Sequence, residues 1–305
     1  MKEIRRTAIV GLGALGLLYG EQIMEAFGYE AVSFLMDEER FERHKDDVYT
    51  INGKVMQFNV TRVSEAKPVD LIIVATKSTG LKSALDVMAP AVGKDTIIIS
   101  VLNGISSEGV IAERFGKERV LGCVAIGMDA MREGSKLEYC SKGRLQLGTL
   151  IPGQEEMLTD LTHFFDEIGQ TYEVKEDIMQ AMWGKFLLNV GVNQSCMIYE
   201  TSYAGVLKEG EIKESMLKVM QEVLVVGQAE GIAIGEADLQ RALAVTASLK
   251  PDGYPSMRQD AIAHRATEVE LFAGTIMKLA AKHGIEVPAN TMYYQKIKEI
   301  EAQYS

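Results

Sequence analysis

The sequence has few residues that could form disulfides or bind metals. Its 305 residues include three cysteines and four histidines. The cysteines are odd in number and form no Cys-x-x-Cys pair, which fits a reducing compartment better than an oxidising one. No two histidines have the spacing of zinc ligands, so we expect no metal centre. The cysteines are Cys123, Cys140 and Cys196, and the histidines are His44, His163, His264 and His283.

The chain also lacks an excess of positive charge. It has 32 basic against 43 acidic residues, which gives a formal net charge of −11. A sequence-independent nucleic-acid binder, or a protein that docks on anionic lipid, would show the opposite balance. We therefore expect neither nucleic acid nor a membrane as a partner. A phosphate-bearing small ligand stays open, because a helix N-terminus can hold phosphate without net positive charge.

Long apolar runs are missing as well. The uncharged stretch Thr7–Gly20 follows three basic residues and superficially resembles a signal peptide. It is shorter than the ~20 residues that span a bilayer, and glycines interrupt it. We interpret it as a buried strand that turns into a helix, and we expect a cytoplasmic protein.

Strands and helices alternate through the first half of the chain. At ~150 residues per domain, the length allows two ordinary domains. Buried parallel strands are predicted at Thr7–Val10, Ala31–Met36, Leu71–Ala75 and Thr96–Leu102, and helices at Ala14–Phe27, Ser78–Met88 and Ser106–Phe115. This alternation is typical of an α/β domain with a Rossmann-type doubly wound sheet.

The remaining segments follow other patterns. Asn52-Gly53 predicts a tight hairpin within Tyr49–Phe58. Further strand-like pieces at Val120–Ile126, Lys136–Tyr139 and Arg144–Leu147 indicate an antiparallel extension of the sheet. From about Glu176 onward the pattern is helical almost throughout. We predict a dinucleotide-binding domain at 1–175 and an all-helical substrate domain at 176–305.

A glycine-rich turn follows the first predicted strand and opens the first predicted helix. It reads Gly11, Leu12, Gly13, Ala14, Leu15, Gly16. In a dinucleotide-binding turn, the first glycine permits the bend, the second lets a pyrophosphate approach, and the third allows close helix–strand packing. The alternative is a glycine-rich strand–helix turn without a ligand. The position of the motif at the first strand favours dinucleotide binding.

An acidic residue stands near the end of the second predicted strand. Asp37 lies where a carboxylate can bind the ribose hydroxyls of NAD and repel the 2′-phosphate of NADP. Its alternative role is a solvated helix start, where acids favour the helix dipole. Arg40 and Arg43 leave the opposite cofactor preference open, unless they pair with neighbouring acids.

Three polar residues share one predicted helix near the domain boundary. Lys185, Asn189 and Asn193 are spaced i, i+4, i+8 among apolar neighbours, so they line one side of the helix. Such groups are costly to bury unless they meet partners. An exposed polar stripe is the alternative. Lys77 and Asn103 follow the third and fourth strands, where open α/β sheets place ligands, but they could also be a surface lysine and a turn asparagine.

Two late residues complete the candidate set. Ser256 opens the segment Ser256-Met257-Arg258-Gln259-Asp260, and Glu268 follows twelve residues after Ser256. Taken alone, Ser256 reads as a helix N-cap. Glu268 alone reads as a helix-surface acid that pairs with Arg265 or another cation.

Taken together and in this order, these residues resemble the ketopantoate reductase (2-dehydropantoate 2-reductase) family over nearly the whole chain. The resemblance implies hydride transfer from a nicotinamide cofactor, NADPH by family default, to the 2-keto carbon of 2-dehydropantoate. The product would be pantoate, on the route to pantothenate and coenzyme A. Lys185 would then be the proton donor, and Glu268 would contact both cofactor and substrate. Substrate would be held by Asn103, Asn189, Asn193 and Ser256, and cofactor by Gly11–Gly16, Asp37, Arg40, Lys77, Asn103 and Glu268.

The chemistry is consistent with these roles. Hydride arriving at a ketone carbon leaves negative charge on the oxygen, which a nearby ammonium group stabilises and protonates. An ordinary lysine, with a pKa of ~10.4, is charged at neutral pH.

The sequence departs from the family pattern at three places. The family often has arginine where this chain has Asp37, so NADH is an alternative cofactor. Gln194 and Tyr203-Ala204 stand where the family often has proline and Asn-Gly. A reductase of another 2-keto acid, or a dinucleotide sensor without catalysis, are therefore alternatives. The C-terminal helices and the 16 methionines fit either a homodimer interface or core filling.

Overall fold

The computed structural model describes residues 2–304. The chain forms two compact units, Met1–Ile178 and Met179–Ser305. From the sequence, we predicted the boundary between the dinucleotide-binding domain and the substrate domain at residue 175.

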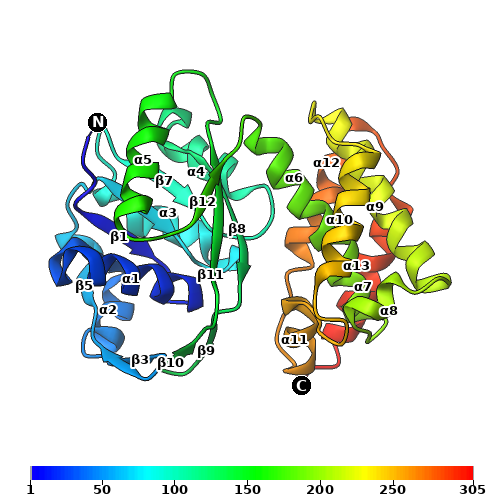
Figure 1. Cartoon of the computed structure of the whole chain (residues 1–305), viewed down its shortest axis with the longest axis horizontal. Coiled ribbons are helices and arrows are strands. Elements are labelled where there is room, and N and C mark those ends of the chain that lie inside the picture. Colours follow the sequence, from blue (N-terminus) through cyan, green and yellow to red (C-terminus); the bar gives the residue numbers. More distant parts are fainter. Residues whose placement is uncertain (1, 305) are drawn as a thin grey trace. The chain divides into compact units, whose positions relative to one another are not determined.

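A five-stranded parallel sheet forms the centre of the first unit (Figure 1). It contains the four predicted strands and a fifth, β5, that was not predicted. The strand order is β5-β2-β1-β6-β7, and all four neighbouring pairs are parallel. The chain reverses its direction of winding between β1 and β6, which is where open α/β sheets bind ligands. The strands are β1 (Thr7–Val10), β2 (Val32–Met36), β5 (Asn59–Arg62), β6 (Leu71–Val74) and β7 (Ile97–Ser100).

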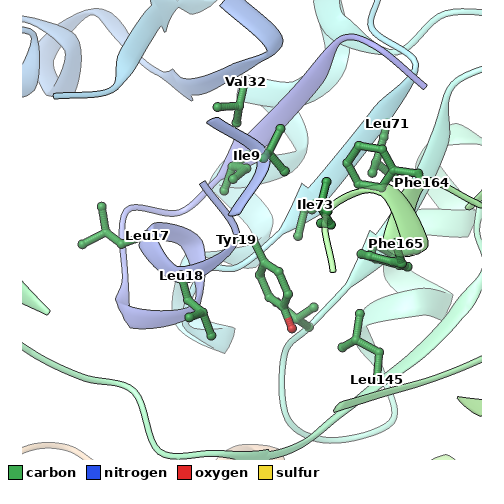
Figure 2. Close-up of a cluster of buried hydrophobic side chains, with 14 of the residues drawn as sticks. Ile9, Leu17, Leu18, Tyr19, Val32, Leu71, Ile73, Leu145, Phe164 and Phe165 are labelled. Carbon is green, nitrogen blue, oxygen red and sulfur yellow. The ribbon is translucent and has the colours of Figure 1, made fainter. Parts of the chain in front are cut away.

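Helices cover both faces of this sheet, because successive strand residues point to opposite sides. Ile9 and Ile73 face a core that contains residues of α1 (Ala14–Phe27) and α5 (Glu155–Glu167). Figure 2 shows part of this core, with Tyr19 of α1 and Phe164 of α5 gathered around the strands. The alternate residues pack with α3 (Leu81–Met88) and α4 (Ser107–Phe115) in a second cluster. The doubly wound arrangement is thereby confirmed.

The other strands do not extend the central sheet, so that prediction was wrong. They form a four-stranded sheet, β4-β3-β10-β9, and a three-stranded sheet, β12-β11-β8. Among residues 2–304, one isolated parallel bridge, from Ile98 to Val120, joins the segment before β8 to the edge strand β7. The strands are β3 (Tyr49–Ile51), β4 (Lys54–Met56), β8 (Gly122–Met128), β9 (Met131–Glu133), β10 (Lys136–Glu138), β11 (Lys142–Gly148) and β12 (Tyr172–Val174).

The error lay in the pairing and not in the strand positions. The predicted hairpin is present, with Asn52 and Gly53 at φ 45° and 84° between β3 and β4. However, β3 also pairs with β10, and β11 with β12, in parallel. Such pairings join segments far apart in the chain, and local sequence patterns do not reveal them.

The second unit is built from helices, as predicted. It contains two short π-helical turns, η6 (Asn189–Asn193) and η7 (Glu270–Gly274). The α-helices are α6 (Ile178–Leu188), α7 (Gln194–Ile198), α8 (Tyr203–Leu207), α9 (Glu211–Ala229), α10 (Glu236–Ser248), α11 (Ser256–Ile262), α12 (Thr275–His283) and α13 (Pro288–Glu301).

The first unit also has α2 (Glu38–His44) and the 3-10 turn η3 (Ser78–Gly80).

Candidate active site

The glycine-rich turn between β1 and α1 is tightly folded. Gly11 has φ +119°, and a Cβ there would overlap the carbonyl of Ala75, which follows the neighbouring strand β6. A Cβ on Gly16 would overlap the carbonyl oxygen of Gly11. Both positions therefore require glycine, because the backbone of the turn touches both the next strand and the helix that it opens.

No side chain caps the N-terminus of α1 at its N-cap residue. Gly13 is the N-cap and makes no side-chain capping bond, while its carbonyl accepts from the amide of Leu17. The first amides of a helix have no intrahelical acceptor, so they can bind an anion placed there. Leu12, Ala14 and Leu15 anchor the turn, because they pack against the core below the sheet.

Asp37 lies directly after β2, and its carboxylate caps the next helix. Its Oδ1 accepts from the backbone amide of Arg40 at 2.7 Å, as expected of an N-cap of α2. The helix-start reading is thus correct in this respect. The side chain is still 49% exposed, and its Oδ2 lies 4.0 Å from the guanidinium of Arg40. Capping leaves the second oxygen accessible, so it does not exclude ribose binding.

A cation that was not predicted from the sequence, Arg62, lies beside Asp37. Arg62 ends β5 and is paired in register with Met36, the residue before Asp37. Its guanidinium lies over the ring of Phe41, with 4.2 Å to the centroid. It also contacts three carboxylates, those of Glu38 at 3.6 Å, Glu42 at 3.8 Å and Glu65 at 3.5 Å. Only recognition of the polar edge strand β5 could have revealed this neighbour.

Two further predicted residues follow β6 and β7 at the same edge of the sheet. Lys77 is exposed and precedes η3, and Asn103 is half-buried in the loop before α4. Below this loop, the Ser100 hydroxyl donates to Ser107, whose hydroxyl donates to Glu108 at 2.9 Å. Glu108 is only 4% exposed, a buried acid that sequence analysis did not identify.

The lysine and the two asparagines of the second unit do not share one regular α-helix. Lys185 is half-buried in α6, but the helix changes to π geometry at Asn189. Asn193 donates from Nδ2 to Oδ1 of Asn189 at 3.3 Å. Both amides are buried, and Nδ2 of Asn189 has no hydrogen-bond partner among residues 2–304. π-turns occur frequently at functional sites.

Ser256 and Glu268 lie on segments near this π-turn. The helix α11, which begins at exposed Ser256, contacts η6, and so does η7, which begins just after half-buried Glu268. The N-cap interpretation of Ser256 is wrong, because the N-cap of α11 is Pro255. Arg265 donates to Asp260 at 2.7 Å. The pairing of Glu268 with a cation stays a prediction.

The two departures from the family pattern in the second unit, at Gln194 and at Tyr203-Ala204, have distinct surroundings. Gln194 is fully buried, and its amide donates back to the carbonyl of Val190 at 2.7 Å. Tyr203 and Ala204 donate their backbone amides to the carbonyls of Gly253 and Pro251. These two hydrogen bonds hold the loop that leads to α11. Burial raises the pKa of the Tyr203 hydroxyl to about 12.

Other chemistries lack a basis in the described part of the chain. Residues 2–304 contain no cluster of three or more histidines, cysteines or acids that could hold a metal ion. Burial raises the pKa of the Cys196 thiol to about 12, so it is no thiolate nucleophile at neutral pH. Within the same residues, no helix has both the length and the apolar character to cross a bilayer.

Comparison with known proteins shows matches along most of the chain. Residues 7–151 match the family described as Ketopantoate reductase PanE/ApbA, and residues 177–301 match Ketopantoate reductase PanE/ApbA C terminal. A 2-dehydropantoate 2-reductase of Streptococcus pyogenes serotype M1 is 24% identical over 299 residues, which cover 96% of this chain and 97% of the relative.

Solved structures share the fold. The ternary structure of D-mandelate dehydrogenase with NADH and anilino(oxo)acetate has a TM-score of 0.83 and 24% identity, covering 98% of this chain and 99% of that one. A dimeric ketopantoate reductase from Staphylococcus aureus has a TM-score of 0.76 and 19% identity, covering 98% and 100%.

Proposed function

Since the chain belongs to the ketopantoate reductase family of oxidoreductases, we propose that it reduces a 2-keto acid to the 2-hydroxy acid. The leading substrate is 2-dehydropantoate, which the name of the Streptococcus relative supports. Pantoate would be the product, and the enzyme would then act in pantothenate biosynthesis.

The observation that carries this proposal is the unpaired amide of Asn189. Leaving a buried N–H without an acceptor costs about 1–3 kcal/mol. Nδ2 of Asn189 is such a donor, while Oδ1 of the same side chain accepts from Asn193. Lys185 lies four residues earlier in the chain. A carboxylate or hydroxyl oxygen of a bound hydroxy-keto acid would satisfy it.

The chain supplies the proton and holds the keto acid. When bound, a nicotinamide dinucleotide supplies the hydride. Lys185 then stabilises the negative charge that develops on the former carbonyl oxygen and protonates it. Asn103, Asn189, Asn193 and Ser256 hold the polar groups of the acid. Glu268 orients cofactor and substrate.

The glycine-rich turn fits the phosphates of such a cofactor. The uncapped start of α1 presents backbone amides. Among residues 2–304, a Cβ on Gly13 would meet only the Ala75 carbonyl oxygen within 4 Å, at 3.7 Å. A phosphate can therefore approach the backbone at this residue. We assign the diphosphate to Gly11–Gly16 and assign Lys77 and Asn103 to the remainder of the cofactor.

We further propose that the enzyme prefers NADH to NADPH. Asp37 presents an exposed carboxylate oxygen where the adenosine ribose would lie, and this oxygen repels a 2′-phosphate. The two nearby arginines do not offset this repulsion, because each is already near carboxylates. Arg40 lies beside Asp37 itself, and Arg62 contacts three other carboxylates. NADH in the D-mandelate dehydrogenase structure also supports this preference.

The test is a screen of purified protein with both cofactors and a panel of 2-keto acids. We expect oxidation of NADH, faster than that of NADPH, with 2-dehydropantoate giving the highest kcat/KM. A higher kcat/KM with another keto acid would replace the substrate while keeping the reaction class. Cofactor binding without oxidation under any keto acid would favour the sensor alternative.

A second candidate is reduction of a different 2-keto acid. It rests on Gln194 and Tyr203, which replace residues typical of the family, and on the likeness to D-mandelate dehydrogenase. Tyr203 supports the loop before Ser256, so its replacement of the family residue bears on how that loop is shaped. The panel therefore includes aryl and branched aliphatic 2-keto acids.

We also propose a homodimer, which the dimeric Staphylococcus enzyme supports. Light scattering coupled to size-exclusion chromatography should give twice the chain mass of 33.6 kDa. A mass of one chain across a range of concentrations would contradict it.

A further inference from the structure

Two carbonyls of the π-turn η6 accept hydrogen bonds from side chains of the next helix. Ser195 donates from Oγ to the carbonyl of Gly191 at 2.7 Å, and Gln194 donates to that of Val190, also at 2.7 Å. Both side chains are fully buried. A π-turn replaces the usual i→i+4 backbone bonding by i→i+5. The two side chains thus fasten the segment that carries Asn189 and Asn193.

The Ser195 hydroxyl continues to α13. Its Oγ lies 2.8 Å from the hydroxyl of Tyr293, which is also fully buried. A serine hydroxyl has one proton, and that proton is given to the Gly191 carbonyl, which can only accept. Tyr293 must therefore donate to Ser195. Burial raises the pKa of Tyr293 to about 12, so the phenol keeps this proton at neutral pH.

The π-turn is also fixed from the side of α9. A Cβ on Gly191 would overlap the side chain of Met220, so the turn lies directly on that helix. Tyr293 packs edge-to-face against Tyr199, with ring centroids 6.4 Å apart, and Tyr199 donates to Ser215 of α9. The chain of hydroxyls therefore connects the π-turn to α13, and its end is held by a packed aromatic pair.

We propose that Ser195 and Tyr293 are positioning residues for the keto acid, acting through the directed chain Tyr293 OH to Ser195 Oγ to the Gly191 carbonyl. The chain holds η6 in π geometry, which keeps the amide of Asn189 turned towards the substrate with Asn193 bonded behind it. Return to α-helical bonding would rotate Asn193 relative to Asn189. This inference rests on the proposed function.

The test compares three variants with the wild-type enzyme. Tyr293→Phe and Ser195→Ala each remove one hydroxyl. Thr246→Val is the matched control, because buried Thr246 donates to the carbonyl four residues earlier, Ala242, at 2.8 Å in the ordinary helix α10. We expect KM for the keto acid to rise about fivefold to tenfold in the first two variants, the scale of one lost hydrogen bond. KM for the dinucleotide should stay unchanged, and Thr246→Val should lower only the thermal midpoint.

The double variant Ser195→Ala/Tyr293→Phe should match the worse single variant, because both changes break one chain. Tyr293→Phe keeps the ring packing, so it remains informative if Ser195→Ala does not fold. Keto-acid KM within twofold of wild type in folded Tyr293→Phe would overturn the inference, as would an equal rise in Thr246→Val. No turnover by the wild-type enzyme would overturn the proposed function and this inference with it. Normal wild-type turnover with unchanged variants would overturn the positioning role alone.

Discussion

The Nδ2 group of Asn193 donates to Oδ1 of Asn189 across 3.3 Å within the π-turn. This bond decides which end of the Asn189 amide is left for a ligand. The oxygen already accepts one hydrogen bond, whereas the nitrogen has no partner among residues 2–304. The π-turn therefore presents a hydrogen-bond donor, and the ligand group that it selects is an acceptor such as a carboxylate.

Asn189→Asp tests this polarity with almost no change of shape. The substitution replaces the Nδ2 donor by a carboxylate oxygen, which repels an anionic keto acid. We expect KM for the keto acid to rise tenfold or more, with KM for the dinucleotide unchanged, in steady-state kinetics. Gln240→Glu is the control, because it makes an equal change of charge at an exposed residue of α10. It should leave the KM for the keto acid and the KM for the dinucleotide unchanged. A KM near the wild-type value in Asn189→Asp would remove Asn189 from the substrate site.

Lys185→Ala tests the proton donor. We expect kcat to fall by ~10²-fold or more, the scale of general acid catalysis. Cofactor affinity, measured by fluorescence titration, should change little. Lys278→Ala removes an exposed lysine from α12 of the same unit and should keep full activity. If Lys185→Ala retains the wild-type kcat, another group must protonate the product.

The sequence was sufficient to predict the four buried strands of the central sheet, because each is a short apolar run. β1 and α1 begin and end at the predicted residues. The amphipathic helix α5 and the polar edge strand β5 were not predicted. β5 is half-buried along its whole length and its sequence is mostly polar, so it contains no apolar run from which a strand could be predicted. The two smaller sheets were missed as separate sheets, because they depend on pairings between distant segments.

The candidate site shows the same limit. The spacing of Lys185, Asn189 and Asn193 correctly indicated one helical segment. The π-turn that brings the two asparagines into contact could not be predicted, because it depends on Met220, Ser195 and other groups that become neighbours only in the fold. The roles of these residues stay predictions until the kinetic tests are made.

Asp37→Asn tests cofactor preference without disturbing the helix start. Asparagine can still cap α2 through Oδ1, but it no longer repels a 2′-phosphate. We expect the ratio of kcat/KM for NADPH to that for NADH to rise about tenfold, which corresponds to ~1.4 kcal/mol. Asp37→Arg should shift the ratio further. It should also lower the free energy of unfolding by about 1 kcal/mol, because the cap is lost.

The neighbouring acid supplies the control for this experiment. Glu39→Gln removes an equal charge from the same helix, at a residue that is exposed and paired with Arg43. It should leave the cofactor ratio nearly unchanged. An unchanged ratio in Asp37→Asn would show that this carboxylate does not lie at the ribose.

An ion-pair cluster in the second unit should make its stability depend on pH. Glu230 lies at the end of α9, and its carboxylate bonds to Lys282 at 2.8 and 3.0 Å and to His283. The hydrogen bond from Lys282, with a further contribution from His283, holds the pKa of Glu230 below its ordinary value of 4.5. A carboxyl group whose pKa is lowered in the folded state stabilises the fold above its unfolded pKa. This contribution is lost as the pH falls from about 4.5 through the lower folded pKa.

Glu230→Gln should therefore lower the free energy of unfolding at pH 7 by about 1 kcal/mol. This is the upper end of the range for surface ion pairs, because the Glu230 side chain is only 19% exposed. The difference from wild type should be smaller at pH 3 than at pH 7, because a growing fraction of Glu230 becomes protonated as the pH falls below 4.5, and protonated glutamate matches glutamine in charge. Urea unfolding at pH 7, 5 and 3 measures it. Glu209→Gln breaks the more exposed pair with Lys213 and should have no measurable effect at any of these pH values. A difference between wild type and Glu230→Gln that is as large at pH 3 as at pH 7 would show that charge at Glu230 does not contribute to the stability.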